Sequence, residues 1–224
     1  MARVNEKEAA RDRVLSDDEL RALWRVTEAT PMPHGHFVRF LPLTAVRRNE
    51  AAKMVREEVS PDGTWIIPAV RMKAKQEHVV PLSPAARAIL DDLPNVSRYV
   101  FTTTGFSAIR NFWSFKEKLD AEMLPALRRA AEGRGEDPGR ISVAPWVLHD
   151  LRRTARSLMS RAQVNPDIAE RVLAHTIGGV RGVYDRYAYI EEKRHALKAL
   201  AAMIERIVSP PADNVVPMRS GETA

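Results

Sequence analysis

The sequence predicts a mainly helical chain with one small antiparallel β-sheet, an α+β fold. Most of its apolar residues recur at the three- and four-residue spacing of amphipathic helices. Residues 61–83 differ, because they read as a turn, a strand, a short basic bend and a second strand. The 224 residues are 45% apolar, which is enough for one sizeable hydrophobic core. We therefore expect one main domain.

Helices are expected in front of this hairpin. Residues 16–19 (SDDE) match a capping box, and the apolar stripe of a helix follows over residues 20–29. An apolar stretch over residues 36–46 then leads into a short helix over residues 47–59.

The second half of the chain is expected to be helical with one more strand. Ser83 and Pro84 start a helix, because proline is favoured at the first helical position. Residues 98–105 are predicted as a short strand, and residues 125–145, rich in charge, glycine and proline, as a surface excursion. The remaining helices are expected over residues 109–124, 147–163, 165–175 with Asn165 as the cap, and 189–208.

Both ends of the chain are expected to lie outside the ordered domain. We predict a flexible arm over residues 1–14, one domain over residues 15–208 and a disordered tail over residues 209–224. The charged start has no apolar run behind it, and no window approaches the ~18 consecutive apolar residues of a membrane span. We therefore predict a cytoplasmic protein that does not enter a membrane.

The charge balance favours a polyanionic partner. Lys and Arg outnumber Asp and Glu by 35 to 29, and the pI is about 9.8. The absence of cysteine excludes disulfides, thiolate metal sites and cysteine nucleophiles. His34 and His36 lack a third ligand in the sequence pattern, so we interpret them as ordinary residues at a helix start and expect no metal.

One helix carries a cationic strip beside its apolar stripe. His149, Arg152, Arg153 and Arg156 are spaced at i, i+3, i+4 and i+7, so they share one face. Arg152 lies nearest the apolar edge and is expected to be held rigidly and partly enclosed. The strip is either a solvated basic face or a phosphate clamp, since a rigid guanidinium matches two phosphate oxygens.

Two other places carry candidate functional side chains. Arg47 and Glu50, three apart at a helix start, can hold each other on one face. Lys73 and Lys75 lie at the bend of the predicted hairpin, where lysines usually only improve solubility.

Three of the four tyrosines cluster near the end of the chain, nine or more residues after His175. Tyr184 follows a Gly178-Gly179 break, and a tyrosine beside histidine and arginine clusters is a candidate nucleophile. A free phenol has a pKa near 10, so it needs help from its surroundings. The alternative for each of these tyrosines is aromatic packing.

The order and spacing of these candidate residues resemble the conserved motifs of the tyrosine recombinase family, also called the phage integrase family. The resemblance is carried by LTAVRRNEAAKM, IIPAVRMKAKQEHVVPLS, LHDLRRTAR, VLAH and GVYDRYAYIEEKRHALKAL, and it covers residues 15–206. The sequence of these segments is most similar to that of integrases from prophages and genomic islands.

The resemblance implies a role for each matching residue. Arg47 and Arg152 would hold the oxygens of the scissile phosphate, with Glu50 supporting them, and Lys73 would protonate the leaving 5′ oxygen. The remaining implied roles are phosphate positioning and proton transfer for His149 and His175 and nucleophilic attack for Tyr184, which leaves Tyr187 and Tyr189 as packing residues. As basic residues, Arg48, Lys75, Arg153 and Arg156 are separate candidates for contacts to DNA phosphates. No metal or cofactor is implied.

The resemblance also implies partners and a setting. It predicts double-stranded DNA as the substrate, a tetramer of the chain on paired DNA sites, a directionality factor, and a bacterial or phage-encoded protein at the nucleoid. The chain departs from the family at Ala45, where glycine is more usual, a change that we expect the turn to tolerate. The expected N-terminal core-binding domain has no counterpart, so the sequence reads as a catalytic fragment or a truncated integrase.

Two alternatives share the fold. One is a non-catalytic DNA-binding remnant. The missing counterpart of the N-terminal core-binding domain favours this alternative, and the complete set of catalytic motifs argues against it. The other is a strand transferase similar to type IB topoisomerases, which uses the same covalent chemistry.

Overall fold

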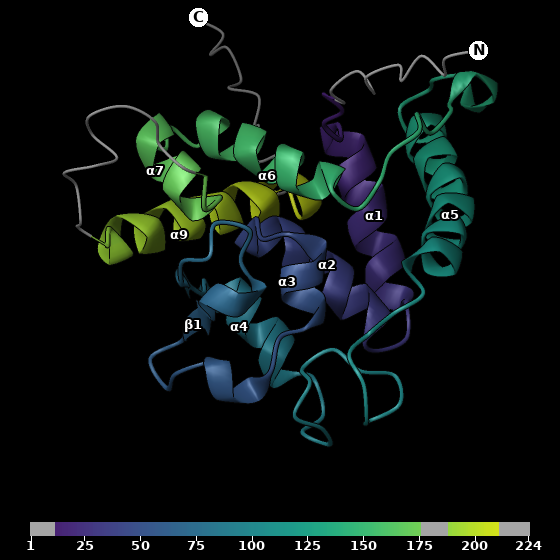
Figure 1. Cartoon of the computed structure of the whole chain (residues 1–224). Helices are drawn as coiled ribbons and strands as arrows, with labels where there is room; N and C mark the ends of the chain where they lie inside the picture. Colours follow the sequence, from purple (N-terminus) through teal and green to yellow (C-terminus); the bar gives the residue numbers. More distant parts are fainter. Residues whose placement is uncertain (1–11, 176–187, 211–224) are drawn as a thin grey trace, which may run out of the picture.

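The computed structural model describes residues 12–175 and 188–210, and this part of the chain is mainly helical with one two-stranded antiparallel sheet (Figure 1). The predicted α+β fold is therefore confirmed. The helices and strands are α1 (Asp17–Ala29), α2 (His34–Thr44), α3 (Arg48–Ala52), β1 (Thr64–Ile67), β2 (His78–Pro81), α4 (Pro84–Asp91), α5 (Phe112–Glu132), α6 (Asp150–Arg161), α7 (Pro166–Val172) and α9 (Ile190–Val208), with short 3₁₀ turns at Arg56–Glu58, Ala69–Arg71 and Pro138–Arg140.

The centre of the core is α2, which packs against α1, α3, α4, α6 and α9. A helix that is apolar on nearly all sides can only be accommodated in an interior. Phe37 and Phe40 of α2 are fully buried and contact the ring of Phe101, and Phe40 also contacts Trp65 of β1. Aromatic residues therefore connect the central helix to the sheet.

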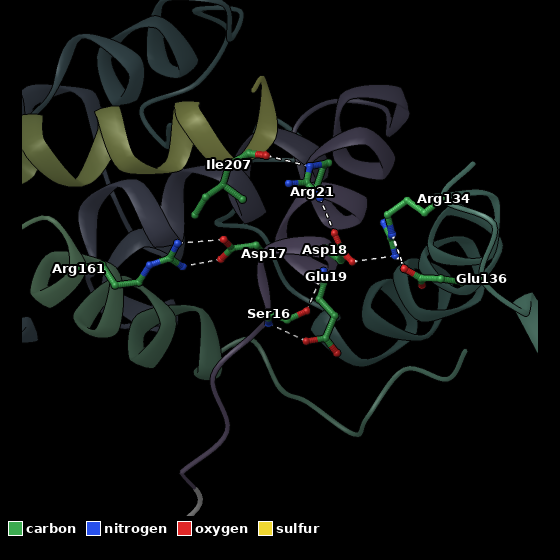
Figure 2. A network of polar contacts seen from close by, with 9 residues as sticks. All are labelled: Ser16, Asp17, Asp18, Glu19, Arg21, Arg134, Glu136, Arg161 and Ile207. Carbon is green, nitrogen blue, oxygen red and sulfur yellow. Dashed lines mark hydrogen bonds and ion pairs between the residues drawn. The ribbon is translucent and has the colours of Figure 1, made fainter. Parts of the chain in front are cut away.

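The first two turns of α1 contact the ends of α6 and α9 (Figure 2). The predicted capping box between Ser16 and Glu19 is present. Beside it, Asp17 accepts two hydrogen bonds from Arg161 at the end of α6, at 2.5 and 2.9 Å. Arg21 donates to the main-chain oxygen of Ile207 near the end of α9, at 2.9 Å. The exposed ion pair between Asp17 and Arg161 is worth roughly 0–1 kcal/mol, so its main effect is to fix how the helix ends meet.

The predicted hairpin is confirmed. Thr64 pairs with Pro81 and Ile67 with His78, so β1 and β2 run antiparallel. The segment between them carries Lys73 and Lys75, both exposed, and Lys75 adopts a left-handed conformation. Asn165 also caps α7 as predicted, accepting a hydrogen bond from the main-chain N–H of residue 167.

The strand predicted over residues 98–105 is wrong. Only an isolated bridge between Val55 and Tyr99 forms. The chain then turns, because the hydroxyl of Thr102 donates to the main-chain oxygen of Ser107 and accepts from the N–H of Gly105. Threonine side chains that bond their own loop in this way compete with strand pairing.

Two helix boundaries also differ from the prediction. The surface excursion predicted over residues 125–145 begins later, because α5 continues to Glu132. The apolar stripe of α5 extends through Ala126 and Leu127, which pack on Ala22 of α1, and through Ala131, which is also buried. The helix predicted over residues 47–59 is only five residues long, and a 3₁₀ turn follows it.

The arrangement places α6, α7 and α9 together, with α1 and α5 side by side on another flank (Figure 1). The apolar stripe of α9 is buried through Leu197, Leu200 and Ile204. No helix within the described ranges is both long and apolar enough to cross a membrane.

Candidate active site

The start of α6 brings the predicted basic strip to the core. His149 is the N-cap residue, and Leu151, Ala155, Leu158 and Met159 form the buried stripe. Arg152 is only 5% exposed, which confirms the expectation that this arginine is the enclosed one. The helix start is held by the buried Asp150, whose carboxylate accepts a hydrogen bond from the main-chain N–H of Val147 at 2.8 Å.

Arg152 joins three parts of the chain through its guanidinium. Nη1 donates to the main-chain oxygen of Ala45 at 2.5 Å. Nη2 donates to the main-chain oxygen of Leu173 and lies 3.1 Å from Nε2 of His175. Burial, and then the charge of Arg47 nearby, lower the pKa of Arg152 to about 10, so it remains cationic at neutral pH.

Arg47 and Glu50 form the predicted pair. The Glu50 carboxylate is buried and accepts from the main-chain N–H of Arg47 at 2.8 Å and from its Nη1 at 2.9 Å. The carboxylate therefore fixes both the backbone and the side chain of Arg47. The guanidinium stays partly exposed, with its remaining N–H groups open to a ligand.

One open groove brings the predicted residues of three segments together. Its lining includes Arg47, Arg48 and Glu50 from the start of α3, Lys73 from the hairpin, and His149 from the start of α6. Burial first, and then the charges of Arg153 and Arg152, lower the pKa of His149, so this imidazole is neutral at pH 7. The groove combines fixed cations with a neutral histidine, which suits an anionic ligand.

His175 follows α7 and completes the contact to Arg152. Its Nδ1 lies 2.6 Å from Oε2 of Glu170, and Oε1 of Glu170 accepts from Nε of Arg156 at 2.7 Å. Glu170 is not among the site residues predicted from the sequence. The only sequence signal for Glu170 was its position five residues before His175. That spacing brings the two side chains together only because the chain reverses at the end of α7.

That helix end is a Schellman motif. Ala174 adopts a left-handed conformation with φ 49°. The N–H of His175 donates to the oxygen of Glu170 at 3.0 Å, and the N–H of Ala174 to that of Arg171 at 3.1 Å. The motif returns His175 to the level of Glu170 and also directs the oxygen of Leu173 toward Arg152.

The other predicted side chains have varied surroundings. Arg153 pairs with Asp150 at 2.5 Å, and Arg156 pairs with Glu170, so both already have partners within the protein. Their contacts to DNA phosphates stay predictions, as do those of Arg48 and Lys75. Tyr184 and Tyr187 lie outside the described residues. Tyr189 is the N-cap of α9, and the guanidinium of Arg171 lies 3.8 Å from its ring centroid, in keeping with a packing role.

The two helix-entry histidines make ordinary contacts. His36 lies 2.7 Å from Oδ2 of Asp92, and His34 contacts the ring of Phe115. Among residues 12–175 and 188–210, no three His, Asp or Glu side chains lie close enough together to hold a metal ion.

Comparison with known proteins finds similarity to phage and prophage integrases. The model of the phage integrase family matches residues 13–189. Prophage integrase IntZ of Escherichia coli (strain K12) is 35% identical over 176 residues, which cover 77% of this chain and 40% of IntZ. The chain thus spans less than half the length of this relative.

Solved structures share the fold at low sequence identity. The lambda integrase catalytic core superposes with a TM-score of 0.52 at 16% identity, over 76% of this chain and 95% of that one. A lambda integrase tetramer bound to a Holliday junction gives a TM-score of 0.55 at 16% identity, over 80% of this chain and 51% of that one. With the family model matching most of its length and a prophage integrase 35% identical to it, the chain belongs to the phage integrase family of tyrosine recombinases and carries the fold of its catalytic domain.

Proposed function

We propose that this chain is the catalytic part of a site-specific DNA recombinase that cuts and rejoins DNA strands through Tyr184. The observation that carries the proposal is the meeting of Arg47, Lys73 and His149 in one groove, with Arg152 enclosed beside them. We extend the proposal to a catalytic domain over residues 15–208, with an arm over residues 1–14 and a tail over residues 209–224.

Arg47 and Arg152 bind the scissile phosphate. Three of the five N–H groups of Arg152 are directed to Ala45, Leu173 and His175, which leaves two for phosphate oxygens. Arg47 is oriented by Glu50 in the same way. Cations whose positions are set before the reaction can stabilise the charge that develops on the phosphorane without reorganising.

The proton transfers fall to the remaining residues. The phenol of Tyr184 loses its proton to His175, and its oxygen forms a bond to phosphorus while the bond to the 5′ oxygen breaks. Lys73, exposed on the hairpin segment, gives a proton to that leaving oxygen. The neutral His149 positions the phosphate. The products are a 3′-phosphotyrosyl enzyme and a free 5′-hydroxyl, and reversal of the same steps on a new strand rejoins the DNA.

The charge of the surrounding surface supports double-stranded DNA as the substrate. A neighbouring groove shares Lys53 and Arg71 with the one described above and adds Arg98 and Arg110. Cations placed along a continuous surface can follow a phosphate backbone. By analogy with the lambda integrase tetramer on its Holliday junction, we extend the proposal to a tetramer on paired sites. A directionality factor and a location at the nucleoid of a bacterial cytoplasm belong to the same proposal.

The test is a covalent trap. A duplex with a nick close to the cleavage site loses its short 5′-hydroxyl fragment after attack, so the phosphotyrosyl adduct accumulates and survives denaturant. Tyr184→Phe should abolish the adduct, and Tyr187→Phe should still form it. An adduct that depends on Tyr187 instead would overturn the assignment of the nucleophile.

The same experiment separates the alternatives. DNA binding without any adduct on cognate nicked duplexes would establish a non-catalytic remnant. Relaxation of supercoiled plasmid without a defined target would point to an activity like that of type IB topoisomerases.

A further inference from the structure

A line of three contacts connects two helices through His175. Arg156 of α6 donates from Nε to Oε1 of Glu170 at 2.7 Å. Oε2 of Glu170 lies 2.6 Å from Nδ1 of His175, and Nε2 of His175 lies 3.1 Å from Nη2 of Arg152. Neither the sequence boxes nor the proposed reaction assigns a role to Glu170, which lies in the middle of this line.

The groups on either side of His175, the guanidinium of Arg152 and the carboxylate of Glu170, determine which ring nitrogen carries the proton. A guanidinium has N–H donors and no acceptor, so Nε2 of His175 must accept from Arg152. The ring proton is therefore on Nδ1, where it is donated to the carboxylate of Glu170. A proton on Nε2 would set two donors against each other at 3.1 Å.

Glu170 is well placed to hold this arrangement. Burial alone would raise the pKa of Glu170, but the hydrogen bonds from Arg156 and His175 outweigh burial and lower it, so the carboxylate is ionised at neutral pH. Its backbone is equally constrained, because the main-chain oxygen of Glu170 accepts from the N–H of His175 in the Schellman motif. Side chain and main chain thus both hold His175 against Glu170.

We propose that Glu170 is a positioning residue that fixes His175 as the Nδ1–H tautomer and so keeps Nε2 as a proton acceptor at the reaction centre. This inference rests on the proposed function for its catalytic consequence. When phosphate also draws the Nη2–H that Arg152 directs to His175, in addition to the two N–H groups that have no protein acceptor, the lone pair of Nε2 is released to the phenol. The proton of the phenol moves to Nε2, and the imidazolium that forms is stabilised by the carboxylate of Glu170 until rejoining returns the proton.

A purely structural role predicts something different. In that case the ion pair between Arg156 and Glu170 would only fasten α7 to α6, and loss of either partner would act alike. Arg156→Gln removes the pair and leaves the carboxylate beside His175, whereas Glu170→Ala removes both. The tautomer of His175 distinguishes the two roles, because only Glu170→Ala should change it.

The first measurement uses the full chain without DNA. With the histidines labelled with ¹⁵N, the ring shifts of His175, assigned with His175→Gln, report which nitrogen carries the proton. We expect the Nδ1–H tautomer in the wild type, in Arg156→Gln and in Glu170→Gln, whose amide oxygen still accepts from Nδ1. In Glu170→Ala no carboxylate holds the ring against Arg152, so the partly exposed imidazole should turn into solvent and populate the Nε2–H form. An unchanged tautomer in Glu170→Ala would overturn the inference.

The second measurement is the single-turnover rate of adduct formation at saturating nicked duplex. Glu170→Ala should slow it about 100-fold, at the low end of what acid–base groups contribute, with the Kd for DNA within twofold of wild type. Glu170→Gln should recover most of that loss, and Glu117→Ala, an exposed glutamate on α5, should match the wild type. A Glu170→Ala rate equal to that of Glu117→Ala would refute the catalytic consequence.

Failure of the proposed function would look different. A wild type that shows the Nδ1–H tautomer but forms no adduct would overturn the recombinase proposal. The positioning of His175 by Glu170 would then still be supported. An active wild type whose tautomer and rate are indifferent to Glu170→Ala would overturn this inference alone.

Discussion

The guanidinium of Arg152 donates to the main-chain oxygen of Ala45 at 2.5 Å, across 107 residues of sequence. Ala45 ends α2 in a left-handed conformation with φ 54°, and its side chain is fully buried. A second left-handed alanine, Ala174, ends α7 next to the oxygen of Leu173, which also accepts from Arg152. Two helix ends therefore hold one buried arginine through their carbonyls.

Arg152→Lys should lose both cleavage and stability. A lysine ammonium retains the charge but cannot reach the two carbonyls, His175 and a phosphate together. We expect adduct formation to fall at least about 100-fold, as when one donor to a developing anion is removed. The buried carbonyls left without a partner should lower the free energy of unfolding by about 1–3 kcal/mol.

The control for this variant lies on the same helix. Arg161→Lys affects an exposed ion pair with Asp17 and should change the free energy of unfolding by less than about 1 kcal/mol. Urea denaturation of both variants and the nicked-duplex assay provide the measurements. A cleavage rate of Arg152→Lys near that of wild type would contradict the need for a planar, multiply bonded cation.

Ala174→Gly should stabilise the protein. A left-handed alanine costs roughly 1–2 kcal/mol, and the extra freedom of glycine in the unfolded chain removes only about 0.4–1 kcal/mol of the gain. Ala174 is only partly buried, so little packing is lost. Thermal and urea unfolding should show a gain of about 0.5–1 kcal/mol.

The matched control is Ala130→Gly within α5, where the backbone is right-handed. That change should destabilise the protein by about 1 kcal/mol. Equal effects of the two substitutions would show that the strain at Ala174 is negligible.

The helices and the hairpin were predictable because local signals and burial agree. The capping box at Ser16, the Asn165 cap and the apolar stripe of α6 each have a sequence signature, and each is present. The position of Arg152 at the edge of that stripe predicted its burial. The contact between Arg47 and Glu50 was predictable for the same reason, since three residues at a helix start set their separation.

The remaining features depend on contacts between distant segments. The extension of α5 to Glu132 depends on packing against α1, which outweighs the local charge and glycine content. The segment at Tyr99 has strand-like residues but only a single bridge to Val55. Glu170 was not predictable because the Schellman motif after it has alanine at the position where glycine is the usual signal.

A buried lysine should make stability depend on pH. Lys193 of α9 is only 6% exposed and donates from Nζ to the main-chain oxygen of Val79 at 2.9 Å. Burial, and then the charge of Arg171, lower its pKa to about 8. Between that value and the pKa of about 10.4 in the unfolded chain, the unfolded state binds more protons, so stability rises with pH.

Lys193→Met should remove this contribution. Because a folded-state pKa below the unfolded one means that charged Lys193 destabilises the fold below pH 8, Lys193→Met should be stabilised relative to wild type at pH 7. The advantage should shrink by roughly 2 kcal/mol as the pH rises from 8 to 10. Urea denaturation across this range measures both curves. Parallel curves would mean that the ammonium is well solvated in the folded protein.

The role proposed for Lys73 can be tested at the leaving atom. Replacing the bridging 5′ oxygen with sulfur gives a leaving thiolate, which is far less basic than an alkoxide, as the pKa of about 8.5 of the cysteine thiol illustrates, so its departure needs little help from a general acid. Lys73→Ala should cleave the oxygen duplex about 100-fold or more slowly than wild type and the sulfur duplex at nearly the wild-type rate. Arg152→Lys should stay slow on both, because it weakens the stabilisation of phosphate charge and not the protonation of the leaving group. If sulfur fails to rescue Lys73→Ala, Lys73 acts on the phosphate, and the proton for the leaving oxygen must come from another group in the groove that also contains His149.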